Sequence, residues 1–288
     1  MRMAMGKKTF GFFTLLARKA SFNRLPLWTP AMPKGISKPK QTHTHTANSL
    51  KVVYFPSCIN QVMGQAKGDP DQRPLHEVMV ALLKKAGYEL VHPENMGSLC
   101  CGTIWESKGF SEQADQKSAE LEQALIKASK NGEYPVLCDQ SPCLYRMRNT
   151  MKQLKLYEPV EFIDTFLMDK LTFTRRKETV AVHATCTTVK MGNRDLITKL
   201  AAACAEHVVV PDEVGCCGFA GDRGFTFPEV NTYALRKLHP YIKKSGATSG
   251  YSNSRTCEIG LTTNSGISYS SIVYLVDKCT AAIPNNKI

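Results

Sequence analysis

The sequence predicts an α/β protein built from two pseudo-symmetric repeats, each with parallel-sheet βα units and cysteine-bearing loops at the carboxyl ends of its strands. Strand-like apolar patterns alternate with amphipathic helix patterns in both halves, which is typical of parallel sheets. Residues 52–58 align with residues 180–186 without a gap. A lone cysteine, a vicinal Cys-Cys-Gly and further cysteines occur in the same order in both halves, which indicates an internal repeat.

The first repeat is expected to deliver a cysteine after each of its strands. Cys58 follows the first strand, the Cys100–Cys101 pair follows the second, and Cys138 and Cys143 follow the third. Hydrophobic periodicity predicts strands at 51–56, 88–91 and 134–137, and helices at 75–85 and 111–129.

The second repeat is expected to have the same order. Its strands lead to Cys186, to the Cys216–Cys217 pair and to Cys257. Asn193 is expected to cap a helix that runs through Cys204. The other predicted elements are strands at 179–184, 208–210 and 247–251, and a helix at 229–244. Ligands of parallel sheets bind beyond the carboxyl ends of the strands, which is where all these cysteines fall.

Thiolates gathered from distant parts of a chain suit a soft metal or an iron–sulfur cluster. Gly102 and Gly218 directly follow the vicinal pairs and permit the sharp turn that would aim both cysteines at one centre. Structural zinc is the alternative, weakened because the short Cys-x2-4-Cys knuckles of zinc sites are absent. A thiol-redox catalyst would need Cys-x-x-Cys, which is also absent.

Length and composition describe a two-domain soluble protein. The predicted parts are a basic arm or linker at 1–50, a first domain at 51–170 and a second domain at 171–288. Eleven cysteines is an odd number in a long chain, which favours a reducing compartment. Residues 1–50 hold nine Lys/Arg and no acidic residue, so +9 of the net charge of +12 lies there and a nucleic-acid surface is not expected.

The basic arm has two interpretations. Its apolar stretch at 10–17 is far shorter than the roughly 20 residues that span a bilayer, so no transmembrane segment is expected. The prolines and tryptophan of residues 25–35 favour an extended docking segment, followed by a polar linker at 41–48. A mitochondrial transit peptide is the alternative. The expected location is the cytoplasm or the periphery of a membrane, with mitochondria as the alternative.

The motifs at 54–60, 100–110, 183–187, 216–225 and 252–258 resemble the tandem CCG cysteine-rich domain family. That family occurs in the cysteine-rich component of heterodisulfide reductases and in the iron–sulfur subunits of glycolate oxidase and lactate-utilisation complexes. The nearest resemblance, which includes the arm at 25–35, is to the C-terminal region of fused FAD-linked D-lactate dehydrogenases.

The resemblance implies an iron–sulfur module that passes electrons from reduced flavin to an acceptor. By that pattern the first set of ligands is Cys58, Cys100, Cys101, Cys138 and Cys143. The second set is Cys186, Cys216, Cys217 and Cys257. In one interpretation the second site is degenerate and holds no cluster. It implies one or two clusters of the 4Fe–4S type, with a five-cysteine non-cubane form as one option for the first set. The family's closing Cys-x-x-Cys is missing, because Arg146 and Gly260 occupy the positions of its last cysteine, and Cys138 aligns with Ser252.

No FAD- or NAD-binding motif, P-loop or ferredoxin-type cysteine run occurs in the sequence. Oxidation of a hydroxy acid would therefore require a flavin-bearing dehydrogenase domain or subunit, and the resemblance adds a ferredoxin-like module and a quinone or cytochrome acceptor. No catalytic residue is assigned. The alternative functions are a catalytic component of the heterodisulfide or quinone reductase type and a structural zinc scaffold.

Some candidates lie outside the repeated pattern. His183 is close to Cys186 and either completes the second site or is a structural histidine. Asp222 and Arg223 either orient the second cysteine loop or form a solvated ion pair. Cys204 and Cys279 are expected to be small buried residues.

Overall fold

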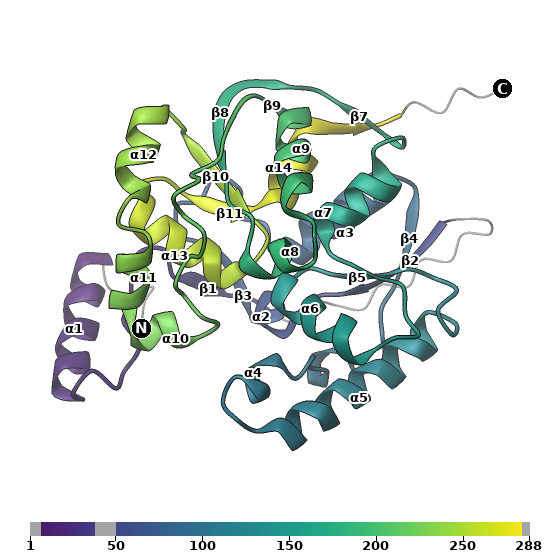
Figure 1. The fold of residues 1–288 in the computed structure, drawn as a ribbon, viewed down its shortest axis with the longest axis horizontal. Helices are drawn as coiled ribbons and strands as arrows, with labels where there is room; N and C mark the ends of the chain where they lie inside the picture. Colours follow the sequence, from purple (N-terminus) through teal and green to yellow (C-terminus); the bar gives the residue numbers. More distant parts are fainter. Residues whose placement is uncertain (1–6, 38–49, 284–288) are drawn as a thin grey trace.

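A computed structural model describes residues 7–37 and 50–283, and within them each half of the chain contains one four-stranded parallel sheet (Figure 1). The helical and strand segments of the first half are β2 (Leu50–Phe55), α2 (Cys58–Val62), β3 (Met63–Ala66), α3 (Leu75–Lys85), β4 (Tyr88–Val91), η1 (Met96–Ser98), α4 (Thr103–Glu106), α5 (Ser111–Ala128), β5 (Val136–Cys138), α6 (Ser141–Thr150) and β6 (Leu156–Tyr157).

A connecting segment leads into the second half, which repeats the alternation of strands and helices. The connecting elements are α7 (Pro159–Phe162), η2 (Ile163–Leu167) and β7 (Leu171–Phe173). The second half comprises β8 (Arg176–Val182), α8 (Cys186–Lys190), α9 (Arg194–Cys204), β9 (Ala205–Val209), α10 (Arg223–Thr226), α11 (Pro228–Ala234), α12 (Leu238–Ser245), β10 (Ser249–Ser252), α13 (Arg255–Ser265), β11 (Tyr269–Ser271), α14 (Ile272–Cys279) and β12 (Thr280–Ala282).

The two parallel sheets have the same strand order. The first sheet runs β4-β2-β5-β6 and the second runs β9-β8-β10-β11, so the strand that carries the repeated sequence is central in both. Tyr54 pairs with Leu137 in the first sheet, and Val182 pairs with Tyr251 in the second. The predicted α/β class with two pseudo-symmetric repeats is therefore confirmed.

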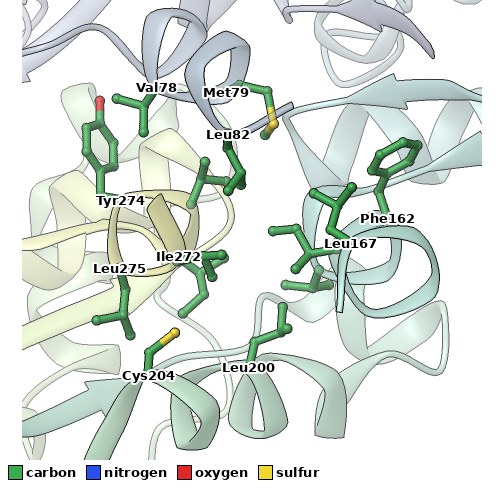
Figure 2. Packing of buried hydrophobic residues seen from close by; sticks show 14 of the residues in the cluster. Val78, Met79, Leu82, Phe162, Leu167, Leu200, Cys204, Ile272, Tyr274 and Leu275 are labelled. Carbon is green, nitrogen blue, oxygen red and sulfur yellow. The ribbon is translucent and has the colours of Figure 1, made fainter. Parts of the chain in front are cut away.

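One hydrophobic cluster joins the two halves. Helix α14 of the second half packs against both α3 of the first half and α9 of the second. Figure 2 shows Leu82 of α3, Leu200 of α9 and Leu275 of α14 around the same core, and all three side chains are fully buried. Burial of such side chains contributes roughly 1.5–3 kcal/mol each, so this core holds the two sheets together.

Several element boundaries agree with the sequence prediction, and two predictions were wrong. Helices α3 and α9 and strand β4 match within a residue, because their apolar periodicity is regular. The single helix expected at 229–244 is instead α11 and α12. Pro240 lies in the first turn of α12, where it has no N–H to continue an earlier helix and would clash with the carbonyl four residues before it. Asn193 precedes α9, but its side chain donates to Glu158 Oε1 at 3.0 Å and makes no cap bond.

The N-terminal arm lies on the second half. Helix α1 (Lys7–Ala20) lies beside α10 (Figure 1), and an extended segment leads from it to β1 (Pro33–Gly35), which pairs with β3. The Leu27 N–H donates to Phe225 O at 2.8 Å, and Arg18 Nη2 donates to Thr226 O at 2.7 Å. The polar linker predicted at 41–48 lies outside the described residues. Among the helices of residues 7–37 and 50–283, none combines the length and hydrophobicity of a bilayer-spanning segment.

Candidate metal centres

The first set of predicted cysteines lies beyond the carboxyl ends of three neighbouring strands. Cys58 is the first residue of α2, directly after β2, and Cys138 is the last residue of β5. The Cys100–Cys101 pair follows β4 and the short η1 turn, and Cys143 lies in the first turn of α6. Because β4, β2 and β5 are adjacent and parallel, their carboxyl ends bring these loops to one edge of the sheet.

The thiols of the first set form a continuous row in which each thiol influences the ionisation of the next. Cys58 contacts Cys100, which contacts Cys101. Cys101 in turn contacts Cys143, and Cys143 contacts Cys138. The structure thus brings together all five cysteines that the sequence singled out.

The second set forms an equivalent row at the edge of the second sheet. Cys186 is the first residue of α8, as Cys58 is of α2, and Cys257 lies in the first turn of α13. Cys186 contacts Cys216, and Cys216 contacts Cys217. The Sγ atoms of Cys217 and Cys257 are 3.0 Å apart. All four predicted members are therefore neighbours.

The turn after each vicinal pair has the same geometry in both halves. Gly102 has φ +86° and Gly218 has φ +69°, in the left-handed region that favours glycine. The N–H of Gly102 donates to Cys100 Sγ at 3.4 Å, and the N–H of Gly218 donates to Cys216 Sγ at 3.4 Å. A Cβ at Gly218 would lie 2.7 Å from Ala234 Cβ, and one at Gly102 would overlap the carbonyl oxygen of Ala114. Both positions therefore require glycine, as predicted for the sharp turn.

Within each row the hydrogen bonds favour a thiolate at the same position. Contacts with Cys101 and Cys58 lower the pKa of Cys100 well below its usual range. Contacts with Cys186 and Cys217 do the same to the pKa of Cys216. The glycine N–H groups add to this effect, because hydrogen bonds to the charged form stabilise it. Deprotonated sulfur is the form that binds metals.

Side chains from distant elements fix the carbonyl groups of the vicinal pairs. Arg146 Nε donates to Cys101 O at 3.0 Å, and Asn231 Nδ2 donates to Cys217 O at 2.6 Å. Gly260 makes room for Asn231, since a Cβ there would lie 2.5 Å from Asn231 Nδ2. Arg146 and Gly260 are the two residues that replace the closing cysteine expected from the family pattern. Asn231 was missed by the sequence analysis, because nothing in its local sequence marks it.

The segments that carry the two cysteine rows contact each other at the junction of the halves. Ser141 Oγ lies 2.7 Å from Thr185 Oγ1, which places the start of α6 against the start of α8. Lys108 Nζ pairs with Asp222 at 2.8 Å, and Arg223 Nη2 donates to Ser107 O at 3.4 Å. Asp222 and Arg223 therefore each contact the segment that follows the first vicinal pair, and their role in orienting the second cysteine loop stays a prediction.

The remaining candidates have separate environments. Cys204 and Cys279 are buried, as predicted, and lie together away from both rows, with Cys279 Sγ 3.5 Å from Cys204 O. His183 is 4% exposed and contacts Ser252. In the described parts of the chain, no three His, Cys, Asp or Glu side chains form a ready-made site for one metal ion.

The CCG cysteine-rich domain model matches residues 52–148 and again 180–262, which together hold both cysteine rows. The chain belongs to the CCG family. Among curated proteins, this CCG chain is 23% identical to Lactate utilization protein A of Oceanobacillus iheyensis over 215 residues, which cover 69% of the chain and 82% of that protein.

The solved structures that are similar to the CCG chain include two proteins of the racemase type. An aspartate racemase homologue from Pyrococcus horikoshii aligns at 12% identity with a TM-score of 0.32. A putative Asp/Glu racemase from Yersinia pestis aligns at 9% identity with a TM-score of 0.34. Both alignments cover 79% of this chain and 96% of the solved chain. Similarity at this level carries no argument about function.

Proposed function

We propose that this CCG protein is an iron–sulfur electron-transfer module of a system that oxidises lactate or a related 2-hydroxyacid. The observation that carries the proposal is the pair of cysteine rows at equivalent sheet edges, each with a glycine N–H directed at the second sulfur of the row. The similarity to Lactate utilization protein A supports the choice of lactate.

The donor set fits iron–sulfur chemistry better than a single zinc ion. Structural zinc sites place four ligands around one ion, whereas the thiols here follow one another in rows of five and four. Clusters with several iron atoms take thiolates that are spread out, and N–H groups directed at sulfur tune their potential. Such a cluster, when bound, accepts and releases single electrons.

The two rows are proposed to hold different centres. The first row supplies five thiolates, which suits a non-cubane four-iron cluster; these come from Cys58, Cys100, Cys101, Cys138 and Cys143. Cys186, Cys216, Cys217 and Cys257 supply four, the number that a conventional 4Fe–4S cluster needs. The loops that carry the two rows contact each other through Lys108 and Asp222.

Substrate oxidation is proposed to occur on a flavin-bearing partner domain or subunit that works with a ferredoxin-like module. The arm offers a place for such a partner, because α1 exposes the apolar side chains of Phe12, Phe13 and Leu16, which are 63%, 52% and 55% accessible. The basic residues of residues 1–50 would suit an acidic partner surface. A quinone or a cytochrome is the proposed acceptor.

The test is metal analysis of anaerobically purified protein, with an EPR spectrum before and after dithionite. Iron and acid-labile sulfide sufficient for one or two clusters, with a signal that changes on reduction, would support the proposal. Zinc without sulfide would overturn it.

Three variants sharpen the metal analysis. Cys100→Ser and Cys216→Ser should each lower the iron content by removing one centre. Cys204→Ser, a buried cysteine outside both rows, should leave the iron content unchanged.

A further inference from the structure

The second row lacks one thiol that the first row has, and the missing thiol is replaced by a specific pair of residues. In the first sheet Cys138 pairs with Phe55 across neighbouring strands. In the second sheet the matching pair is Ser252 and His183, because Val182 pairs with Tyr251 one residue earlier in both strands. The His183 N–H donates to Tyr251 O at 2.9 Å, which holds this register.

The contacts of Ser252 determine which nitrogen of His183 carries the proton. The Ser252 hydroxyl donates its only proton to His183 O at 2.9 Å. Its contact with His183 Nδ1, at 3.4 Å, must then have Nδ1–H as the donor. The lone pair of the neutral ring therefore lies on Nε2. Histidines that bind metals usually donate their other ring N–H to the protein in this way.

The Nε2 atom of His183 is buried and has no hydrogen-bond partner. His183 as a whole is only 4% exposed. A buried polar atom without a partner costs about 1–3 kcal/mol, so such an atom calls for an explanation. His183 lies close enough to Cys216 to act on it electrostatically, and it is three residues from Cys186.

We propose that His183 Nε2 is a fifth protein ligand to iron in the second centre, in place of the thiolate that Cys138 supplies to the first. The second centre would then be a five-ligand cluster like the first, in place of the conventional four-thiolate cluster proposed above. This inference rests on the proposed function, since it requires a cluster at the second row. A neutral imidazole in place of an anionic thiolate raises the reduction potential of an iron–sulfur centre. The second centre would then be the stronger electron acceptor, and electrons would flow from the first row to the second.

The test is pulsed EPR of the dithionite-reduced holoprotein, grown with natural or ¹⁵N-labelled histidine. The expected result is a nitrogen coupling that changes with the label. The coupling should be lost in His183→Gln and kept in His239→Gln, whose ring bonds Ser265 O at 2.9 Å away from the cysteines. A label-insensitive spectrum from protein with its full iron and sulfide would overturn the inference and leave the proposed function intact. Protein without sulfide would overturn the proposed function itself.

A second variant covers the case in which His183→Gln fails to assemble the centre. His183→Cys offers a thiolate at the same place and should keep the iron content, lose the nitrogen coupling and lower the potential of the second centre. An unchanged potential in an iron-loaded His183→Cys protein would contradict ligation by His183.

Discussion

Arg146 Nε donates a hydrogen bond of 3.0 Å to the carbonyl of Cys101, and this contact fixes the backbone of the first vicinal pair. The guanidinium is 7% exposed and also pairs with Asp115 at 2.7 Å and with Glu106. In the second half Asn231 makes the corresponding bond to Cys217 O. An arginine in one repeat and an asparagine in the other therefore make the same hydrogen bond to the second cysteine of the vicinal pair. This indicates that the orientation of that carbonyl group matters to the site.

Replacing Arg146 by methionine should weaken the first centre alone. The change keeps the apolar stem but removes the buried donor, and a lost hydrogen bond of this kind costs about 1–3 kcal/mol. We expect lower iron retention at the first row and a reduced free energy of unfolding, measured by anaerobic denaturation. Arg236→Met, at an exposed position, is the matched control. Equal iron retention in both variants would show that the Arg146 contact is not needed.

A methyl group at Gly260 should disturb the second centre. The added Cβ would lie 2.5 Å from Asn231 Nδ2 and 2.8 Å from Phe219, so Gly260→Ala must displace Asn231 from the Cys217 carbonyl. Overpacking of this kind costs about 1–3 kcal/mol. We expect iron to be lost from the second row. The measurement is the EPR signal of the second centre, which is identified as the signal that is missing in the Cys216→Ser variant. Gly35→Ala, which has open space around it, should bind iron normally.

The grouping of the cysteines and the positions of the helices could be predicted, because both follow from sequence patterns within short segments. The thiol rows could be predicted because a cysteine follows each predicted strand. Helix α3 could be predicted because its apolar residues lie on one face. The break at Pro240 was also readable in principle, since a proline within a helical pattern marks a boundary.

Other features were not readable, because they arise from contacts between distant segments. The fourth strands, β6 (Leu156–Tyr157) and β11 (Tyr269–Ser271), are too short to show a period. Asn231 reaches Cys217 across fourteen residues, and Ser141 meets Thr185 across forty-four. Such polar contacts depend on how the halves pack, which no local pattern encodes.

The arm should detach when Arg18 is replaced by alanine. Arg18 is 7% exposed and bonds Thr226 O and Leu25 O, and hydrogen bonds from a charged group contribute about 1.5–3 kcal/mol. Chymotrypsin cleavage after Trp28 should therefore become about tenfold faster or more. Lys19→Ala, at an exposed position, should be cleaved at the wild-type rate. An equal rate for Arg18→Ala would mean that other contacts hold the arm.

A buried glutamate should make the stability of the protein depend on pH. Glu158 is fully buried, and it accepts bonds from Thr188 at 3.0 Å, Asn193 at 3.0 Å and Asn253 at 2.7 Å. Burial nevertheless raises the pKa of Glu158 from 4.5 to about 7. Between these values the folded state binds more protons than the unfolded state. The free energy of unfolding therefore falls as pH rises from 4.5 through 7, by an amount on the order of 3 kcal/mol.

Glu158→Gln should remove this part of the pH dependence, because glutamine does not ionise. The measurement is anaerobic denaturation at pH 6, 7 and 8, in which the stability of the variant relative to wild type should improve as pH rises. A residual slope is expected from Glu258, since burial also raises its pKa to about 7. Glu133→Gln, at an exposed position, should follow the wild-type curve. Parallel curves for wild type and Glu158→Gln would mean that Glu158 stays ionised in the folded protein throughout this range.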